Sequence, residues 1–123
     1  MGRLTTHVLD TTRGKPGSAI TVSLYRIEGE QRQNLKTVLT NDDGRCDQPL
    51  LEESAFEAGI YELVFALGPY FATHESTAAS DETSPGPRFL DDVVIRFGVS
   101  SPDQHYHVPL LITPYSYSTY RGS

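Results

Sequence analysis

Apolar and polar residues alternate with a period of two along most of the chain. In the run Ile20–Leu24, aliphatic side chains at every second position alternate with Thr and Ser. The runs 60–66, 92–99 and 104–113 are likewise short and rich in β-branched or aromatic residues. Because successive side chains of a strand point to opposite faces, this period predicts β-strands that are apolar on one face.

Turn-forming residues separate the apolar runs at short intervals. Gly14, Pro16 and Gly17 lie in the segment 13–17. Gly29 lies in a hairpin turn, and the run Asn41–Gly44 is a strong turn signal. Turns every ~8–12 residues are typical of an antiparallel β-sandwich, here with seven or eight strands. The expected strands are 4–10, 18–27, 33–40, 60–66, 92–99, 104–113 and 115–121.

Two segments and one proline depart from the strand pattern. The segment Ala66–Glu75 is the best candidate for one short helix. The segment His74–Arg88 is polar and rich in Ser, Thr, Pro and Gly, which predicts a long loop. Pro109 lacks a backbone N–H inside an otherwise regular strand, so an edge or bulge position is expected there.

Composition restricts the class of protein and of partner. The 123 residues predict a single domain, 1–123. Ten Lys and Arg against sixteen Asp and Glu give a net charge of −6, which disfavours binding to nucleic acid or to an acidic membrane surface. No segment approaches the ~18 apolar residues of a membrane-spanning helix, and no secretory signal follows Met1. The single cysteine, Cys46, excludes an internal disulfide.

Histidines on predicted strands are the first candidates for chemistry. His7 lies on the first strand, where an imidazole is most often structural but can also serve as an acid or base near neutral pH. His105 and His107 share one face of their strand. Such a pair can chelate a metal if Cys46 or His7 supplies a third ligand.

Arg45 and the last nine residues are the other polar candidates. Arg45 follows the turn, where it is either solvated or a donor fork for a planar anionic or carbonyl-bearing ligand. The segment 115–123 holds three tyrosines and an arginine, and its alternation predicts a last strand. The chain has no nucleophile elbow, phosphate-binding glycine loop, zinc cysteine pair or dinucleotide motif. The residues alone therefore indicate an acidic all-β domain with a few polar candidates.

Three segments, in this order, carry a resemblance to a known family. They are the opening LTTHVLDTTRGKP at 4–16, the turn TNDDGR at 40–45, and the ending with YHVPLL at 106–111, PY at 114–115 and YRGS at 120–123. Together they resemble the transthyretin-like 5-hydroxyisourate hydrolases. A Tyr-Arg-Gly-Ser ending separates these hydrolases from transthyretin, the hormone carrier. The segments 74–88 and 89–92 depart from the family pattern.

The resemblance implies a transthyretin-like (prealbumin-like) sandwich assembled as a homotetramer, with active sites in a channel between dimers. It implies hydrolysis of 5-hydroxyisourate to 2-oxo-4-hydroxy-4-carboxy-5-ureidoimidazoline, on the route from urate to allantoin, without metal or cofactor. Water is the expected nucleophile, since no activated Ser or Cys motif is present. The site residues that it implies are His7, Arg45, His107, Tyr120, Arg121 and Ser123.

The resemblance also implies a role for each of these residues. His7 and His107 are the acid/base pair, and which of them performs which step stays open. Arg45 contacts the ring carbonyls or the developing oxyanion. Tyr120 and Arg121 clamp the ring. The hydroxyl or carboxylate of Ser123 orients a histidine or the water.

Three other readings compete with the hydrolase. A transthyretin-type carrier would bind a small ligand without chemistry, although the polar residues suit an apolar hormone poorly. A metalloenzyme would use His105 and His107, and a plain interaction domain would show no turnover. Members of the family occur in cytoplasm, periplasm and peroxisomes, and cytoplasm is the default expectation here.

Overall fold

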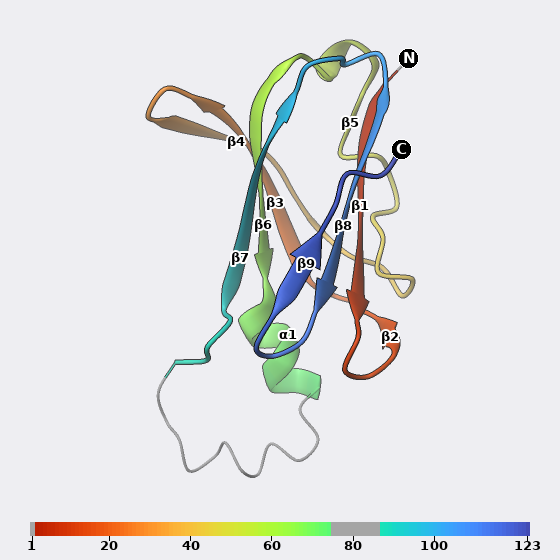
Figure 1. Ribbon diagram of the computed structural model, residues 1–123, viewed down its shortest axis with the longest axis vertical. Coiled ribbons are helices and arrows are strands. Elements are labelled where there is room, and N and C mark those ends of the chain that lie inside the picture. Colours follow the sequence, from red (N-terminus) through yellow and green to blue (C-terminus); the bar gives the residue numbers. More distant parts are fainter. Residues whose placement is uncertain (1, 75–86) are drawn as a thin grey trace.

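Two β-sheets pack face to face in the computed structural model, which describes residues 2–74 and 87–123 (Figure 1). The first sheet has the order β2-β1-β8-β9 with β5 beside β1, and the second has the order β4-β3-β6-β7. The elements are β1 (Arg3–Asp10), β2 (Lys15–Pro16), β3 (Thr21–Glu28), β4 (Gln31–Leu39), β5 (Leu51–Glu52), a 3-10 turn (Glu53–Ala55), β6 (Gly59–Ala66), α1 (Leu67–His74), β7 (Asp92–Val99), β8 (His105–Ile112) and β9 (Tyr117–Thr119).

The predicted β-sandwich with one short helix is confirmed. The described residues hold nine strands rather than seven or eight, because two-residue strands β2 and β5 pair with β1. The predicted helix is present as α1, which lies at one end of the sandwich (Figure 1). The predicted loop 74–88 falls largely on residues 75–86, outside the described residues. No described helix is long and apolar enough to cross a membrane.

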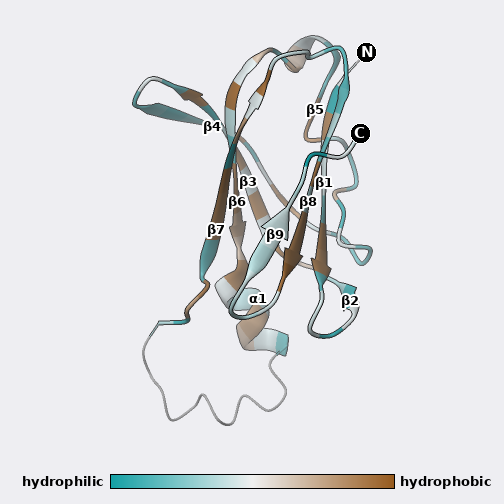
Figure 2. Cartoon of the chain, viewed as in Figure 1, coloured by the Kyte–Doolittle hydropathy of each residue, from teal (hydrophilic) through white to brown (hydrophobic). Residues whose placement is uncertain are grey.

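Alternation along the strands forms the core between the sheets. In β1 the even-numbered side chains are buried and the odd-numbered ones, apart from Arg3, are half-buried on the outer face. Apolar residues gather along β6, β7 and β8, whereas the tip of the β3–β4 hairpin is hydrophilic (Figure 2). Burying one such side chain contributes roughly 1.5–3 kcal/mol. The largest fully buried side chains include Leu4, Ile20, Leu24, Tyr61, Leu63, Phe65, Leu67, Leu110 and Ile112.

The pairing of β1 with β8 is parallel, whereas the other pairs among the described strands are antiparallel. Parallel neighbours need a long crossover connection, and here that connection contains the whole second sheet. In this register Thr5 lies opposite His107, and Arg3 lies opposite His105. The register therefore brings outward-facing polar residues of the two strands side by side.

Pro109 lies inside the first sheet, opposite His7 in an unshifted register between β1 and β8, so the expected edge or bulge position is wrong. β8 is hydrogen-bonded between β1 and β9. The ladder to β9 begins one residue later, at Leu110 opposite Thr119. The carbonyl of Pro109 accepts a hydrogen bond from Thr119 Oγ1 at 2.6 Å. The missing N–H therefore falls just outside this ladder.

Candidate active site

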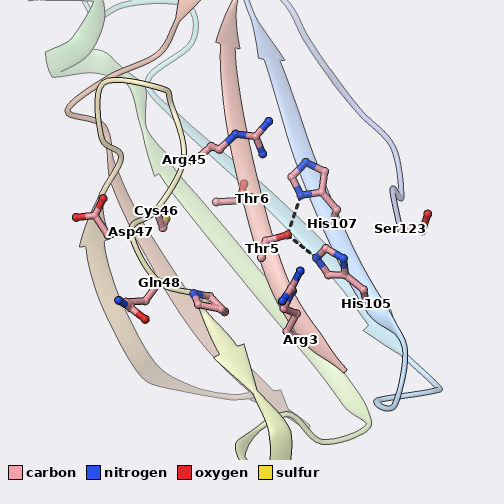
Figure 3. Close-up of a pocket in the computed structure, with 11 residues that line it drawn as sticks. Arg3, Thr5, Thr6, Arg45, Cys46, Asp47, Gln48, His105, His107 and Ser123 are labelled. Atoms are coloured by element: carbon pink, nitrogen blue, oxygen red, sulfur yellow. Dashed lines mark hydrogen bonds between the residues drawn. The ribbon is translucent and has the colours of Figure 1, made fainter. Parts of the chain in front are cut away.

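A cavity of about 310 Å³ opens on the outer face of the first sheet. Its walls come from β1, from the segment after the turn 41–44, from β8 and from the last residue (Figure 3). Three of the six site residues that the family resemblance implied line it: Arg45, His107 and Ser123. The full lining is Arg3, Thr5, Thr6, Arg45, Cys46, Asp47, Gln48, Pro49, His105, His107 and Ser123.

The turn that carries Arg45 is attached directly to β1. Asn41 Oδ1 accepts hydrogen bonds from the amides of Asp43 (2.9 Å) and Arg45 (3.1 Å). Gly44 adopts φ +77°, and a Cβ there would meet the backbone oxygen of Val8. The Val8 amide in turn donates to the Gly44 carbonyl at 2.8 Å. Glycine is required here because only it combines positive φ with this close approach.

His7 lies beside Arg45 and His107, although it does not line the cavity. A β-bridge pairs His7 with Arg45, and the His7 and His107 rings are 6.4 Å apart. His7 Nε2 lies 3.0 Å from the Asp43 carbonyl oxygen. A carbonyl only accepts, so His7 carries its proton on Nε2, and Nδ1 holds the lone pair when the ring is neutral. The structure thus brings together His7, Arg45 and His107, which lie far apart in the sequence.

His105 and His107 face the same side of β8, as the period predicted. Thr5 Oγ1 lies between them, 2.9 Å from His105 Nε2 and 2.8 Å from His107 Nδ1. Among the described residues, no group of three His, Cys, Asp or Glu side chains is placed to hold a metal ion. Sequence reasoning missed Thr5, although its position on the same face as His7 was readable.

All three imidazoles are biased toward the neutral form. Burial lowers the pKa of His7 and of His107, and the positive charge of Arg45 lowers both further. Burial also lowers the pKa of His105, with Arg3 and Arg121 adding to the effect. At neutral pH these rings are therefore proton acceptors rather than cations.

Cys46 lines the same cavity but is poorly suited to act as a nucleophile. Burial raises the pKa of its thiol, and the charge of Asp47 raises it further. The thiolate is the reactive form of cysteine, so little of it is present at neutral pH. This favours water as the attacking group.

The C-terminal residues pair with β8 beside His107. The Gly122 amide donates to the His107 carbonyl at 2.7 Å, and the His107 amide donates to the Gly122 carbonyl at 3.2 Å. A Cβ at Gly122 would lie 3.2 Å from the Cβ of His107. This pairing places Ser123 at the cavity.

Tyr120 and Arg121 do not line the cavity of the single chain. The Arg121 guanidinium stacks 4.1 Å from the centroid of the Tyr106 ring and donates to Gln104 Oε1 at 3.0 Å. Tyr120 is 63% exposed. Of the six predicted site residues, four are therefore gathered at or beside the cavity.

The sequence of this chain is similar to those of known proteins along essentially its whole length. The profile of the HIUase/Transthyretin family matches residues 4–122. The chain is 58% identical over 123 residues to the 5-hydroxyisourate hydrolase of Pseudomonas aeruginosa, covering 100% of this chain and 93% of that protein. It is 38% identical over 122 residues to the 5-hydroxyisourate hydrolase of Mus musculus, covering 98% and 94% of the two chains.

Solved structures share the fold. A 5-hydroxyisourate hydrolase from Klebsiella pneumoniae has a TM-score of 0.77 and 33% identity, with 100% of both chains covered. An (S)-allantoin synthase has a TM-score of 0.87 and 43% identity over 99% of this chain, which spans 44% of that one. Sea bream transthyretin in complex with thyroxine has a TM-score of 0.82, with 98% of this chain and 94% of that one covered. At 22% identity it shows the fold alone.

Proposed function

This chain belongs to the HIUase/transthyretin family, and from that premise we propose that it hydrolyses 5-hydroxyisourate to 2-oxo-4-hydroxy-4-carboxy-5-ureidoimidazoline. Relatives that carry the name 5-hydroxyisourate hydrolase match essentially the whole chain at up to 58% identity. The observation that carries the proposal is that Arg45 and His107 line one cavity and His7 lies directly beside both of them.

The reaction begins with attack of water on a ring amide. As the water oxygen bonds to the carbonyl carbon, a neutral imidazole takes the water proton and the carbonyl electron pair moves onto oxygen. Collapse of this intermediate breaks the C–N bond, and the imidazolium returns its proton to the leaving nitrogen. His7 and His107 are the proposed acid/base pair, and positioned proton transfer of this kind contributes ~10²–10⁴ in rate.

Arg45 supplies the fixed positive charge of the site. Its guanidinium is always protonated and presents several donors in one plane. Placed beside both histidines, it stabilises negative charge on the carbonyl oxygen. It also keeps the imidazoles neutral before the reaction, because a nearby cation disfavours imidazolium. Arg45 thus both keeps the base in its neutral, proton-accepting form and stabilises the oxyanion.

The proposed assembly is a homotetramer in which the tail completes the site. Tyr120 is exposed and Arg121 lies over Tyr106 in the single chain. The proposed clamp on the substrate ring therefore requires either a rearrangement of the tail or a neighbouring subunit. Ser123 is in place at the cavity and is proposed to orient the water or a histidine. Light scattering coupled to size-exclusion chromatography measures the number of subunits.

A transthyretin-type carrier is the weaker alternative. The cavity is lined by arginines, histidines and other polar side chains, which suit a flat polar ring better than an apolar hormone. Two transthyretin structures, one from sea bream and one from Sparus aurata, are 22% and 21% identical to this chain and share its fold alone. The alternative would require saturable ligand binding with no turnover.

A coupled assay tests the proposed function. Urate oxidase generates 5-hydroxyisourate in the cuvette, and its decay is followed by ultraviolet absorbance with and without the protein. We expect accelerated decay that is lost when His107 is replaced by asparagine. Decay at the spontaneous rate from the folded wild-type protein would reject the hydrolase.

A further inference from the structure

A single hydroxyl group connects the two histidines of β8. Thr5 Oγ1 is within hydrogen-bond distance of His105 Nε2 and of His107 Nδ1, at 2.9 and 2.8 Å (Figure 3). The parallel register produces this contact, since Thr5 lies opposite His107 and two residues along from the partner of His105. All three side chains are half-buried in the cavity wall. The three residues therefore form one hydrogen-bonded chain.

The chemistry of a hydroxyl allows two useful arrangements of this chain. A threonine hydroxyl has one hydrogen to donate and two lone pairs that accept. With a ring nitrogen on each side, it donates to one imidazole and accepts from the other. Each arrangement fixes which nitrogen of His107 carries the proton when the ring is neutral.

The charge of Arg45 selects between the two arrangements. The second nitrogen of His107, Nε2, points away from Thr5 and toward the side of the guanidinium (Figure 3). A positive charge there favours a lone pair on Nε2 over an N–H dipole. The proton of neutral His107 is then on Nδ1, and this N–H donates a hydrogen bond to Thr5 Oγ1. The Thr5 hydroxyl hydrogen is left to donate to His105 Nε2.

Resting on the proposed hydrolase function, we infer that Thr5 is a positioning residue that holds His107 with its proton on Nδ1 and a lone pair on Nε2. His105 Nε2 accepts a hydrogen bond from the Thr5 hydroxyl and thereby fixes the direction of that group. In this tautomer Nε2 of His107 takes the proton of the attacking water. In the opposite tautomer Nε2 already bears hydrogen and accepts nothing. Thr5 itself gains and loses no proton.

The first test compares Thr5→Val with Thr5→Ser. Valine keeps the shape and removes the hydroxyl, whereas serine keeps the hydroxyl. We expect Thr5→Val to lower kcat by about 10- to 100-fold with KM within about twofold, less than the ~10⁴-fold cost of losing a carboxylate that orients a catalytic histidine. Thr5→Ser restores kcat to within a few-fold of wild type. Thr37→Val, which removes a strand hydroxyl from the other sheet, is the matched control.

The second test reads the tautomer itself. Long-range ¹H–¹⁵N correlation spectra of histidine-labelled protein distinguish a protonated Nδ1 from a protonated Nε2. We expect wild-type His107 to carry its proton on Nδ1, and Thr5→Val to shift the ring toward the Nε2–H form. Wild-type His107 with its proton on Nε2 would overturn the inference. An unchanged tautomer, or an unchanged kcat, in a folded Thr5→Val protein would do the same.

The two tests separate this inference from the proposed function. The tautomer is measured without substrate, so a wild-type protein with no hydrolase activity still gives a definite answer about Thr5 and His107. If Thr5→Val does not fold, the wild-type and Thr5→Ser spectra decide the tautomer. An active wild type with the wrong tautomer rejects the role of Thr5 alone.

Discussion

The two sheets differ in how their outward-facing ionisable side chains are paired. On the second sheet, the Glu62 carboxylate accepts hydrogen bonds from Arg32 (3.1 Å) and from Arg96 (2.7 Å). On the first sheet, His7, His105 and His107 are hydrogen-bonded only to a carbonyl or a hydroxyl in the described part of the chain. The charge of Glu62 is therefore balanced by two arginines of its own face, whereas none of these three imidazoles forms an ion pair with a carboxylate of the described residues.

This difference sets the protonation states of the two faces. Burial raises the pKa of the Glu62 carboxyl, but the hydrogen bonds from Arg96 and Arg32 more than offset it and leave the pKa below its ordinary value. The histidines have burial and neighbouring arginines acting in the same direction, so their pKa values fall. The first arrangement stabilises a charge, whereas the second keeps a base neutral.

The outer face of the first sheet, with His7, His105 and His107, is called the histidine face here. Removing the C-terminal tail beside it is expected to cause the largest loss of activity. Deletion of Tyr120–Ser123 removes the Gly122 pairing with His107 and the Ser123 side of the cavity. We expect hydrolysis to fall to the spontaneous rate while the far-UV circular dichroism spectrum stays unchanged. Loss of the folded spectrum would show instead that the tail is needed for folding.

Replacing one base on the same face is expected to cost somewhat less. His107→Asn keeps a polar side chain of similar reach but removes the proton acceptor. We expect a loss of at least ~10²-fold in kcat/KM with normal folding and assembly. Turnover near that of wild type would reject His107 as an acid/base residue. The coupled ultraviolet assay provides the measurement.

On the outer face of the second sheet, substitution of Glu62 is expected to lower the stability of the protein and leave its activity unchanged. Glu62→Gln removes the charge that two arginines contact, and we expect about 1–3 kcal/mol of destabilisation. Glu57→Gln is the matched control, because Glu57 is 69% exposed and lies 3.6 Å from Arg26. That control should change stability by less than ~0.5 kcal/mol. Denaturant unfolding and kcat together test whether this face is structural only.

The same carboxylate predicts the sign of a pH dependence. The folded pKa of Glu62 is below its ordinary value of 4.5. Its contribution is therefore fully present above pH ~4.5 and is lost as the pH falls through the lower folded pKa. The fall in Tm with acid should be shallower in Glu62→Gln than in the wild type. Equal slopes would show that ionisation of Glu62 gives no net gain in stability, and that its folded pKa is not lowered.

The smallest expected effect is a change in pKa within the histidine face. Arg45→Met removes a positive charge that disfavours imidazolium, so the pKa values of His7 and His107 should rise. His105 is the internal control, since Arg3 and Arg121 rather than Arg45 act on it. NMR titration of the ring protons measures all three. A parallel rise of His105 would point to a structural change instead of a local charge effect.

Local pattern was sufficient for most of the fold. Alternation in runs such as Ile20–Leu24 predicts a strand because the pattern is visible in residues that are adjacent in the sequence. The two-residue strands β2 and β5 have no period to detect. The parallel pairing of β1 with β8 was invisible for a different reason. Register between segments a hundred residues apart depends on the packing of the whole sandwich.

The site was predictable as a set of residues but not as an arrangement. Arg45 next to His7 follows from the turn attached to β1, which no single segment reveals. Thr5 between His105 and His107 depends on the same cross-strand register. The predicted clamp by Tyr120 and Arg121 stays a prediction, because in one chain Tyr120 is exposed, Arg121 lies over Tyr106 and neither lines the cavity.

The parallel pairing of β1 with β8 also affects how long the unfolded chain needs to fold into its active form. Thr5 and His107 are 102 residues apart. In the β3–β4 hairpin, by contrast, Glu28 pairs with Gln31 across a short turn. Closing a long loop costs more entropy than closing a short one, and contacts of high contact order slow folding. The histidine cluster therefore depends on the most distant class of contact in the chain. Recovery of activity after denaturation should report the completion of folding rather than its first steps.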